Sequence, residues 1–249
     1  MALYGSLTVV MLLIVIQTTV GHWKFLDRTA HSPWLSVSAG TALAYVFVYL
    51  LPKLAAIQEK ISGSSASPTE DFLRVHVYLL ALLGFVVFYW LGWASERASH
   101  DRHSKLLALD RSMILLVLGY SAYFAQLGYM VADLPRPVLG TYFLIGAVLM
   151  LHVLGINHGL RNLHVERYER LLRWVYAAAT LSGWFIGIGT EAPLSTVAFW
   201  SAFTAGGIMI TAIREELPNQ DKARFLPFLA GATITSVVIL LFYDLQSRS

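Results

Sequence analysis

The chain has 249 residues, of which 57% are hydrophobic and only 13% are charged, and its net charge at pH 7 is +3. Soluble domains carry about a quarter charged residues, so this composition excludes an ordinary water-soluble globule. The sequence contains no cysteine, which excludes disulfides, thiolate metal sites and redox thiols.

Eight apolar stretches follow one another along the chain, each close to the ~20 residues that a membrane-spanning helix needs. They cover residues 2–20, 35–51, 73–94, 112–131, 138–158, 174–189, 193–213 and 225–243. We therefore expect an all-α integral membrane protein with eight transmembrane helices. The connections are short, so residues 1–249 should form a single transmembrane domain.

Basic residues are distributed unevenly between the two sides of the predicted bundle. Thirteen of the 18 Lys and Arg residues fall in the first, third, fifth and seventh loops. By the positive-inside rule these loops are cytoplasmic and both termini lie outside, in a plasma membrane or a bacterial inner membrane. The positive charge is thus a topology signal, and nucleic acid is not an expected partner. The expected partners are the lipid bilayer and either further copies of the chain or another membrane protein.

One ionisable side chain, His152, lies in the interior of an apolar stretch. Ionisable groups inside a membrane often mark functional sites. His152 has two interpretations. It is an altered metal ligand or proton-binding switch with Ser121, Tyr120 and Asn157 nearby, or it is a neutral imidazole that bonds a hydroxyl group on the fourth helix and fixes helix packing.

A short motif occurs in both the second and the seventh stretch. A hydroxyl residue precedes Ala-Gly, and Leu-Pro follows with Pro thirteen residues after Ala, as Ser38-Ala39-Gly40 to Leu51-Pro52 and Thr204-Ala205-Gly206 to Leu217-Pro218. The predicted topology makes these two helices run in opposite directions. The motif therefore predicts an inverted-topology repeat, a common construction of transporters. The alternative is that each helix independently uses Ala-Gly for packing and Pro as a stop.

Small residues recur at helical spacing in the fourth and sixth stretches, including Gly119, Ala122, Ala125 and Gly128 in one and Gly183 and Gly187 in the other. Such faces allow helix backbones to approach closely in a membrane. Before the sixth stretch, Glu169 and Arg173 form an i,i+4 acid–base pair. This pair predicts a helical cytoplasmic extension of that span.

These motifs resemble the ZIP (Zrt-, Irt-like) divalent metal transporters. The second-helix motif, the segment Phe203-Thr204-Ala205-Gly206 to Glu215-Glu216-Leu217-Pro218, and Phe228-Leu229-Ala230-Gly231 look like the second, seventh and eighth helices of that family. The resemblance implies a ZIP-like bundle of eight helices with an inverted repeat and both termini outside. It also implies a metal site on the fourth and fifth helices.

Most ligand positions of the family are replaced in this chain. On the fourth helix, Tyr120 stands in place of His and Phe124 in place of Glu, and Ser121 alone is retained. On the fifth, His152 matches the family's His, Val153 replaces a polar ligand, and the following acidic position falls on Ile156 or Asn157. The resemblance thus gives His152, Asn157 and Ser121 as metal-site residues, and Tyr120, Phe124, Val153 and Ile156 as pathway-lining residues.

The chemistry of the remaining donors predicts a degenerate metal site. Zn²⁺ and Fe²⁺ prefer several His, thiolate or carboxylate ligands at once, and an uncompensated buried divalent ion is very costly. We therefore expect either one weakly bound divalent metal or none. Two functions follow: a member of the metal-transporter class with little transport, or a non-transporting scaffold, assembly factor or regulatory partner. The spans contain no carboxylate pair, Ser/His dyad or HExxH motif, so an enzyme is not expected.

Overall fold

The computed structural model describes residues 2–23, 33–62, 68–100, 111–133, 139–190, 193–216 and 225–247. This part of the chain forms eight helical rods and contains no strand. The rods are α1 (Ala2–Thr19) with the 3₁₀ turn η1 (Val20–His22); α3 (Pro33–Tyr45), the π-helical segment η2 (Val46–Leu50) and α4 (Leu51–Ser62); α5 (Pro68–His100); α6 (Arg111–Ala132); α7 (Leu139–Leu163); α8 (Val165–Arg167), the π-helical segment η3 (Tyr168–Leu172) and α9 (Arg173–Gly189); α10 (Leu194–Thr211) with the π-helical segment η4 (Ala212–Glu216); and α11 (Phe225–Ser247).

Each predicted apolar stretch lies on one of these rods, so the all-α prediction is confirmed. Within the described residues, seven helices are long and apolar enough to cross a membrane, and α11 contributes a shorter apolar segment, Phe225–Leu241. The predicted end of the second stretch at residue 51 was wrong, because the helix continues through α4 to Ser62. The polar residues that end the apolar run there, such as Lys53 and Glu59, are compatible with helical backbone.

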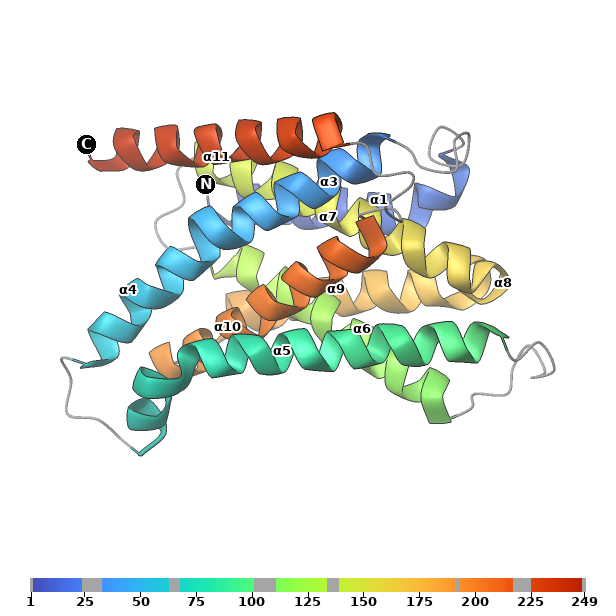
Figure 1. Ribbon diagram of the computed structural model, residues 1–249, viewed down its shortest axis with the longest axis horizontal. Helices are drawn as coiled ribbons and strands as arrows, with labels where there is room; N and C mark the ends of the chain where they lie inside the picture. The colour runs from blue at the N-terminus through green and yellow to red at the C-terminus, as the bar shows by residue number, and fades with distance from the viewer. Residues whose placement is uncertain are drawn as a thin grey trace.

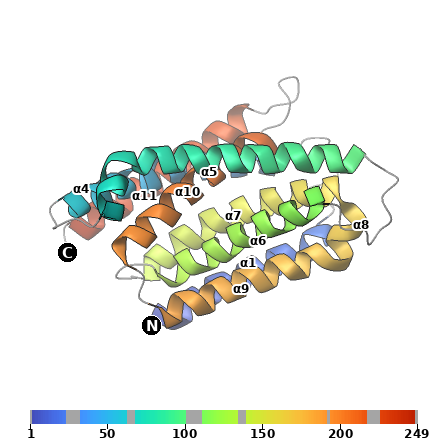
Figure 2. The same cartoon turned by 90° about the horizontal axis from the view of Figure 1, so that it is seen from below.

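Successive rods run in alternate directions through the bundle (Figure 1). Figure 2 shows α1 and α9 side by side at one edge and the long α5 at the opposite edge, with α6 and α7 between them. A continuous hydrophobic core draws residues from all eight rods. The place of each residue in this core decides which side chains of α6 and α7 can contact one another.

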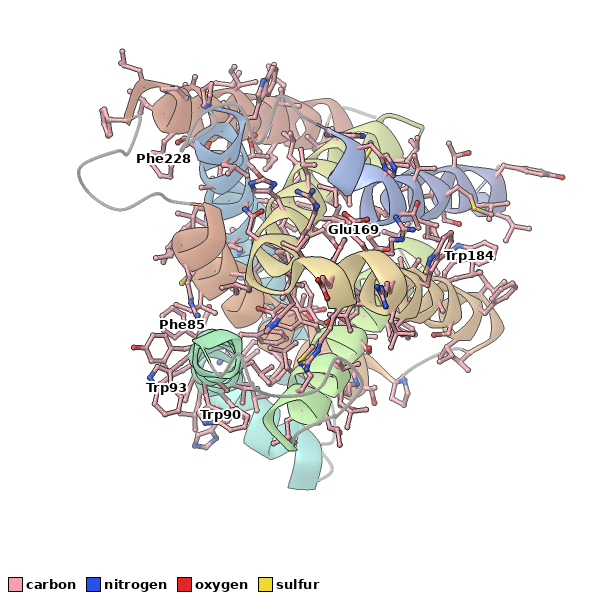
Figure 3. The ribbon with its side chains drawn as sticks, turned by 90° about the vertical axis from the view of Figure 1, so that its right-hand side faces the viewer. Phe85, Trp90, Trp93, Glu169, Trp184 and Phe228 are labelled. Carbon is pink, nitrogen blue, oxygen red and sulfur yellow. The ribbon has the colours of Figure 1, made fainter. Side chains whose placement is uncertain are left out.

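The outward faces of the rods carry large apolar side chains. On α5, Leu82, Trp90 and Trp93 are 55%, 44% and 42% exposed, and Figure 3 shows the two tryptophans pointing away from the bundle. On α11, Ile234 and Leu240 are similarly exposed. A soluble monomer rarely shows such extensive apolar surface, so these faces are consistent with an integral membrane protein.

Three helix pairs cross at points where each helix supplies a glycine. The crossings are Gly40·Gly231 between α3 and α11, Gly84·Gly206 between α5 and α10, and Gly128·Gly183 between α6 and α9. A Cβ atom on any of these six glycines would lie 1.8–2.3 Å from a backbone carbonyl oxygen of the partner helix. Only glycine permits such an approach, which is the way helices pack closely in membranes. Of the predicted small faces, Ala125 and Gly128 in the fourth stretch and Gly183 in the sixth are therefore confirmed as contact positions, whereas Ala122 is exposed.

The rods that carry the repeated motif share a local distortion. The π-helical segment η2 begins six residues after Gly40, η4 begins six residues after Gly206, and each is five residues long. In η2 the N–H of Leu51 bonds the carbonyl oxygen of Val46, and Pro52 follows without an N–H group. A proline removes one helical hydrogen bond, and a π-helical turn is one way to accommodate this loss. Leu217 and Pro218, the second half of the other motif, lie outside the described residues.

Candidate functional site

His152 lies on α7 in the interior of the bundle and is 1% exposed. Its Nε2 atom shares a hydrogen bond of 2.5 Å with the hydroxyl of Tyr123 on α6, and the two rings meet edge to face at 6.1 Å. This geometry agrees with the interpretation of His152 as an imidazole bonded to a hydroxyl on the fourth helix. The expected neighbours were Ser121, Tyr120 and Asn157, and Tyr123 was not predicted.

Aromatic rings from four helices pack around this hydrogen bond. We call them the aromatic cluster, and they comprise Phe88, Tyr120, Tyr123, Phe124, Tyr176 and Phe203. The ring centroids of Phe124 and Tyr176 are 5.1 Å apart, and those of Phe88 and Tyr123 are 4.9 Å apart. Tilted and edge-to-face pairs at such distances add stability beyond the area that they bury. The rings of Phe88 and Phe124 thus pack against the ring of Tyr123.

The four residues predicted to line a pathway are all buried. Tyr120, Phe124, Val153 and Ile156 are at most 1% exposed and belong to the continuous hydrophobic core. The resemblance to the ZIP family implied metal-ligand positions at Tyr120 and Phe124. In this chain the two residues contribute rings to the aromatic cluster.

The structure places Asn157 in a separate polar cluster. Its Nδ2 donates to the Val153 carbonyl at 2.7 Å, and its Oδ1 accepts a hydrogen bond from the Tyr168 hydroxyl at 2.6 Å. The same hydroxyl lies 2.8 Å from the Gln17 carbonyl oxygen, and the Gln17 amide donates to the Thr180 hydroxyl at 2.9 Å. All four polar side chains are completely buried. We call Gln17, Asn157, Tyr168 and Thr180 the polar cluster; it joins α1, α7, η3 and α9.

Ser121 is the third predicted metal-site residue, and its hydroxyl oxygen is buried without a hydrogen-bond partner in the described part of the chain. The side chains of His152, Asn157 and Ser121 therefore lie in three different environments and do not form one site. Among the described residues there is no group of three His, Cys, Asp or Glu side chains that could hold a metal ion. A single imidazole already bonded to a phenol does not match the ligand number or charge that a divalent metal needs.

An ion-pair network lies at the end of the bundle, beside the polar cluster. Glu169 bonds Arg161 at 2.8 Å and Arg173 at 3.0 Å, so the predicted Glu169–Arg173 pair is confirmed. Figure 3 shows Glu169 near the junction with α1, where a Cβ atom on Gly21 would meet its carboxylate. Arg173 also donates to the Thr18 carbonyl at 3.4 Å. The network attaches the end of α1 to the start of α9 and has a structural role.

The junction between α7 and α8 gives the fold an expected pH dependence. Burial lowers the pKa of His164 below its usual value, and the positive charge of Arg167 lowers it further. On acidification the unfolded chain takes up a proton at the ordinary histidine pKa, whereas the folded chain takes it up only at lower pH. The free energy of unfolding should therefore decrease as pH falls below about 6.5, by at most about 1.4 kcal/mol per pH unit from this group.

Melting temperatures of the protein in detergent at pH 7.5, 6.5 and 5.5 would measure this effect. His164→Gln should reduce the decrease in melting temperature, and His22→Gln, at an exposed position, should leave the decrease unchanged. An equal acid-induced decrease in wild type and His164→Gln would contradict the assignment.

The resemblance to the ZIP family rests on short motifs in the second, seventh and eighth helices. No family model matches the chain, and no curated protein is similar to it at a significant level.

Proposed function

We propose that this chain is a non-transporting, ZIP-like membrane protein that acts as a scaffold or regulatory partner in the bilayer. The observation that carries the proposal is the environment of His152. This residue stands at the matched ligand position, yet it is bonded to Tyr123 and enclosed by the aromatic cluster.

Ion passage at this point would require a large rearrangement. Tyr120, Phe124 and Tyr176 are at most 1% exposed, and moving them would disrupt close ring contacts on three helices. The ion would gain one imidazole and neutral oxygens in return, which cannot replace the hydration of a divalent cation. Packing and ligand chemistry therefore both favour a closed pathway.

The inverted repeat is part of this proposal, and the glycine crossings support it. Exchanging α3 with α10 and α11 with α5 converts the Gly40·Gly231 crossing into the Gly206·Gly84 crossing. The same exchange superimposes η2 on η4, because both begin six residues after the exchanged glycine. Two unrelated Ala-Gly motifs would explain the similar sequences. They would not explain why the partner helices also cross at equivalent glycines.

The proposed topology has α11 as an eighth span and both termini outside, in a plasma or bacterial inner membrane. The alternating directions of the rods and the bias of Lys and Arg towards one set of loops support this arrangement. The exposed apolar faces would contact lipid or a membrane partner.

A second candidate function is weak metal transport through a reduced site. It is favoured by His152, which occupies the matched position on α7 and is the single ionisable residue in the interior of the predicted spans. In this case the Tyr123–His152 hydrogen bond would have to open to admit the ion.

Metal uptake into proteoliposomes separates the two candidates. We expect uptake of Zn²⁺, Fe²⁺ or Mn²⁺ by the wild-type protein to equal that of protein-free liposomes, and His152→Ala to leave it unchanged. Size-exclusion profiles before reconstitution would show that both proteins are folded. Uptake by the wild type that is lost in His152→Ala would overturn the proposal in favour of transport.

A further inference from the structure

A cavity of about 160 Å³ lies between α5, α6 and α10, next to the aromatic cluster. Its most distinctive lining residues are four aromatic and two neutral polar side chains, Phe88, Tyr123, Gln126, Trp200, Phe203 and Thr204. None of the described lining residues is charged. The cavity is partly open at the side of the bundle, where Ala122 is exposed and Trp200 is 38% exposed.

One polar group in the wall of this cavity lacks a partner. Thr204 is completely buried, and its hydroxyl makes no hydrogen bond within the described part of the chain. A buried hydroxyl without a partner is unfavourable. A ligand that brings a hydrogen-bond acceptor into the cavity would remove this cost.

The proposed repeat relates this cavity to a second one. Aligning Gly40 with Gly206 and Gly231 with Gly84 matches it to a groove of about 380 Å³ between α3, α7 and α11. The lining positions coincide: Val37 matches Phe203, Thr235 matches Phe88, and at the same spacing along α7 and α6 Ala147, Val148 and Leu151 match Ala122, Tyr123 and Gln126. The alignment rests on the repeat in the proposed function, whereas the cavity and its lining do not.

The comparison shows that the fold itself does not require the aromatic and amide side chains. Val148 and Leu151 occupy the corresponding positions in the second groove. The hydroxyl of Ser38, the counterpart of Thr204, donates to the Leu151 carbonyl at 2.5 Å. One half of the molecule thus satisfies its hydroxyl internally with aliphatic packing around it. The other half leaves the buried Thr204 hydroxyl without a partner within the described residues, beside aromatic walls.

We propose that the cavity between α5, α6 and α10 binds the ring of a benzoquinone-type molecule that enters from the bilayer. Cavities of about 150 Å³ hold one benzene ring, which matches the volume here. The aromatic walls favour a planar ring, and Thr204 and Gln126 supply O–H and N–H donors for ring carbonyl oxygens. The neutral lining selects an uncharged molecule, and the lateral opening leaves room for a hydrophobic tail.

Binding of decyl-1,4-benzoquinone, whose ring carries no substituent besides the tail, to the protein in lipid nanodiscs tests this proposal. Quinones quench tryptophan fluorescence on contact, and Trp200 lines the cavity, so we expect saturable quenching. Ala122→Phe should block the cavity and weaken binding by at least about tenfold. The matched variant Ala147→Phe, at the corresponding exposed position of the second groove, should leave affinity unchanged.

Two milder variants test the polar contacts. Thr204→Val, which conserves side-chain volume, and Gln126→Leu, which introduces the residue of the second groove, should each lower affinity roughly threefold to tenfold. Because Thr204→Val changes little in the packing, it remains informative if Ala122→Phe does not fold. Quenching by the wild type that never saturates would overturn the proposal, as would equal effects of Ala122→Phe and Ala147→Phe. Recovery of the fluorescence on adding an equimolar amount of decylbenzene would also overturn it, because the carbonyl oxygens would then be irrelevant.

Discussion

Gly183→Ala is expected to destabilise the folded bundle by about 3 kcal/mol, near the upper end of the effects of overpacking. An added Cβ atom would lie 1.8 Å from the carbonyl oxygen of Ala125 and 2.7 Å from its Cα atom. Both atoms belong to the backbone of α6, so no side-chain rotation can relieve the contact. The helices α6 and α9 would have to separate, and their close crossing at Gly128 would be lost.

Gly189→Ala provides a control on the same helix. A Cβ atom at Gly189 would meet no atom within 4 Å, so this variant should be neutral or slightly stabilising, since alanine favours helical backbone over glycine. Unfolding in detergent, followed by circular dichroism against temperature or denaturant, would compare the two variants. Similar losses of stability for both would show that the close crossing with α6 is not the cause, because Gly189 makes no such contact.

The glycine crossings show how far sequence predicts this fold. The spacing of Gly128 and of Gly183 predicted which face of each helix is small, and both glycines are confirmed as contact positions. Spacing alone does not identify the partner, because several small faces on different helices are chemically equivalent. The pairing of α6 with α9 is decided by the arrangement of the whole bundle.

A hydrogen bond between His152 and a hydroxyl on the fourth helix was one of the two predicted interpretations, but the residue that carries this hydroxyl was not predicted. Tyr120, Tyr123, Phe124 and Leu127 form the buried face of α6, as expected from a period of 3.6 residues. Ser121 lies one residue, or about 100°, away from Tyr120 on the helix, which removes it from that face. Helical periodicity therefore places Tyr123 on the same buried face as Tyr120, as a second candidate for the hydroxyl partner.

The same geometry explains why Asn157 and His152 do not share a site. Five residues along a helix correspond to a rotation of about 140°, so Asn157 points to η3 and His152 points to α6. No pattern in the sequence predicted the polar cluster that contains Asn157. Gln17, Tyr168 and Thr180 come from distant segments, and no motif connects a buried amide in the first helix to a hydroxyl in the sixth.

Tyr168→Phe is expected to cost about 1–3 kcal/mol of folding stability, which is the cost of leaving buried acceptors unsatisfied. The Tyr168 hydroxyl lies 2.6 Å from Asn157 Oδ1 and 2.8 Å from the Gln17 carbonyl oxygen. Phenylalanine would preserve the ring and remove the single O–H donor that lies within reach of both oxygens in the bundle interior. The loss should also loosen the attachment of α1 to the sixth rod.

Tyr176→Phe is the matched control, because it makes the same chemical change at an equally buried ring. Both tyrosines are 0% exposed, but the Tyr176 hydroxyl makes no hydrogen bond within the described residues. Removing a buried, unpaired hydroxyl eliminates a desolvation cost, so Tyr176→Phe should be neutral or stabilising. Asn157→Leu combined with Tyr168→Phe should destabilise less than the sum of the single variants, since they share one hydrogen bond. If the two Tyr→Phe variants have equal unfolding free energies, the polar cluster does not hold these helices together.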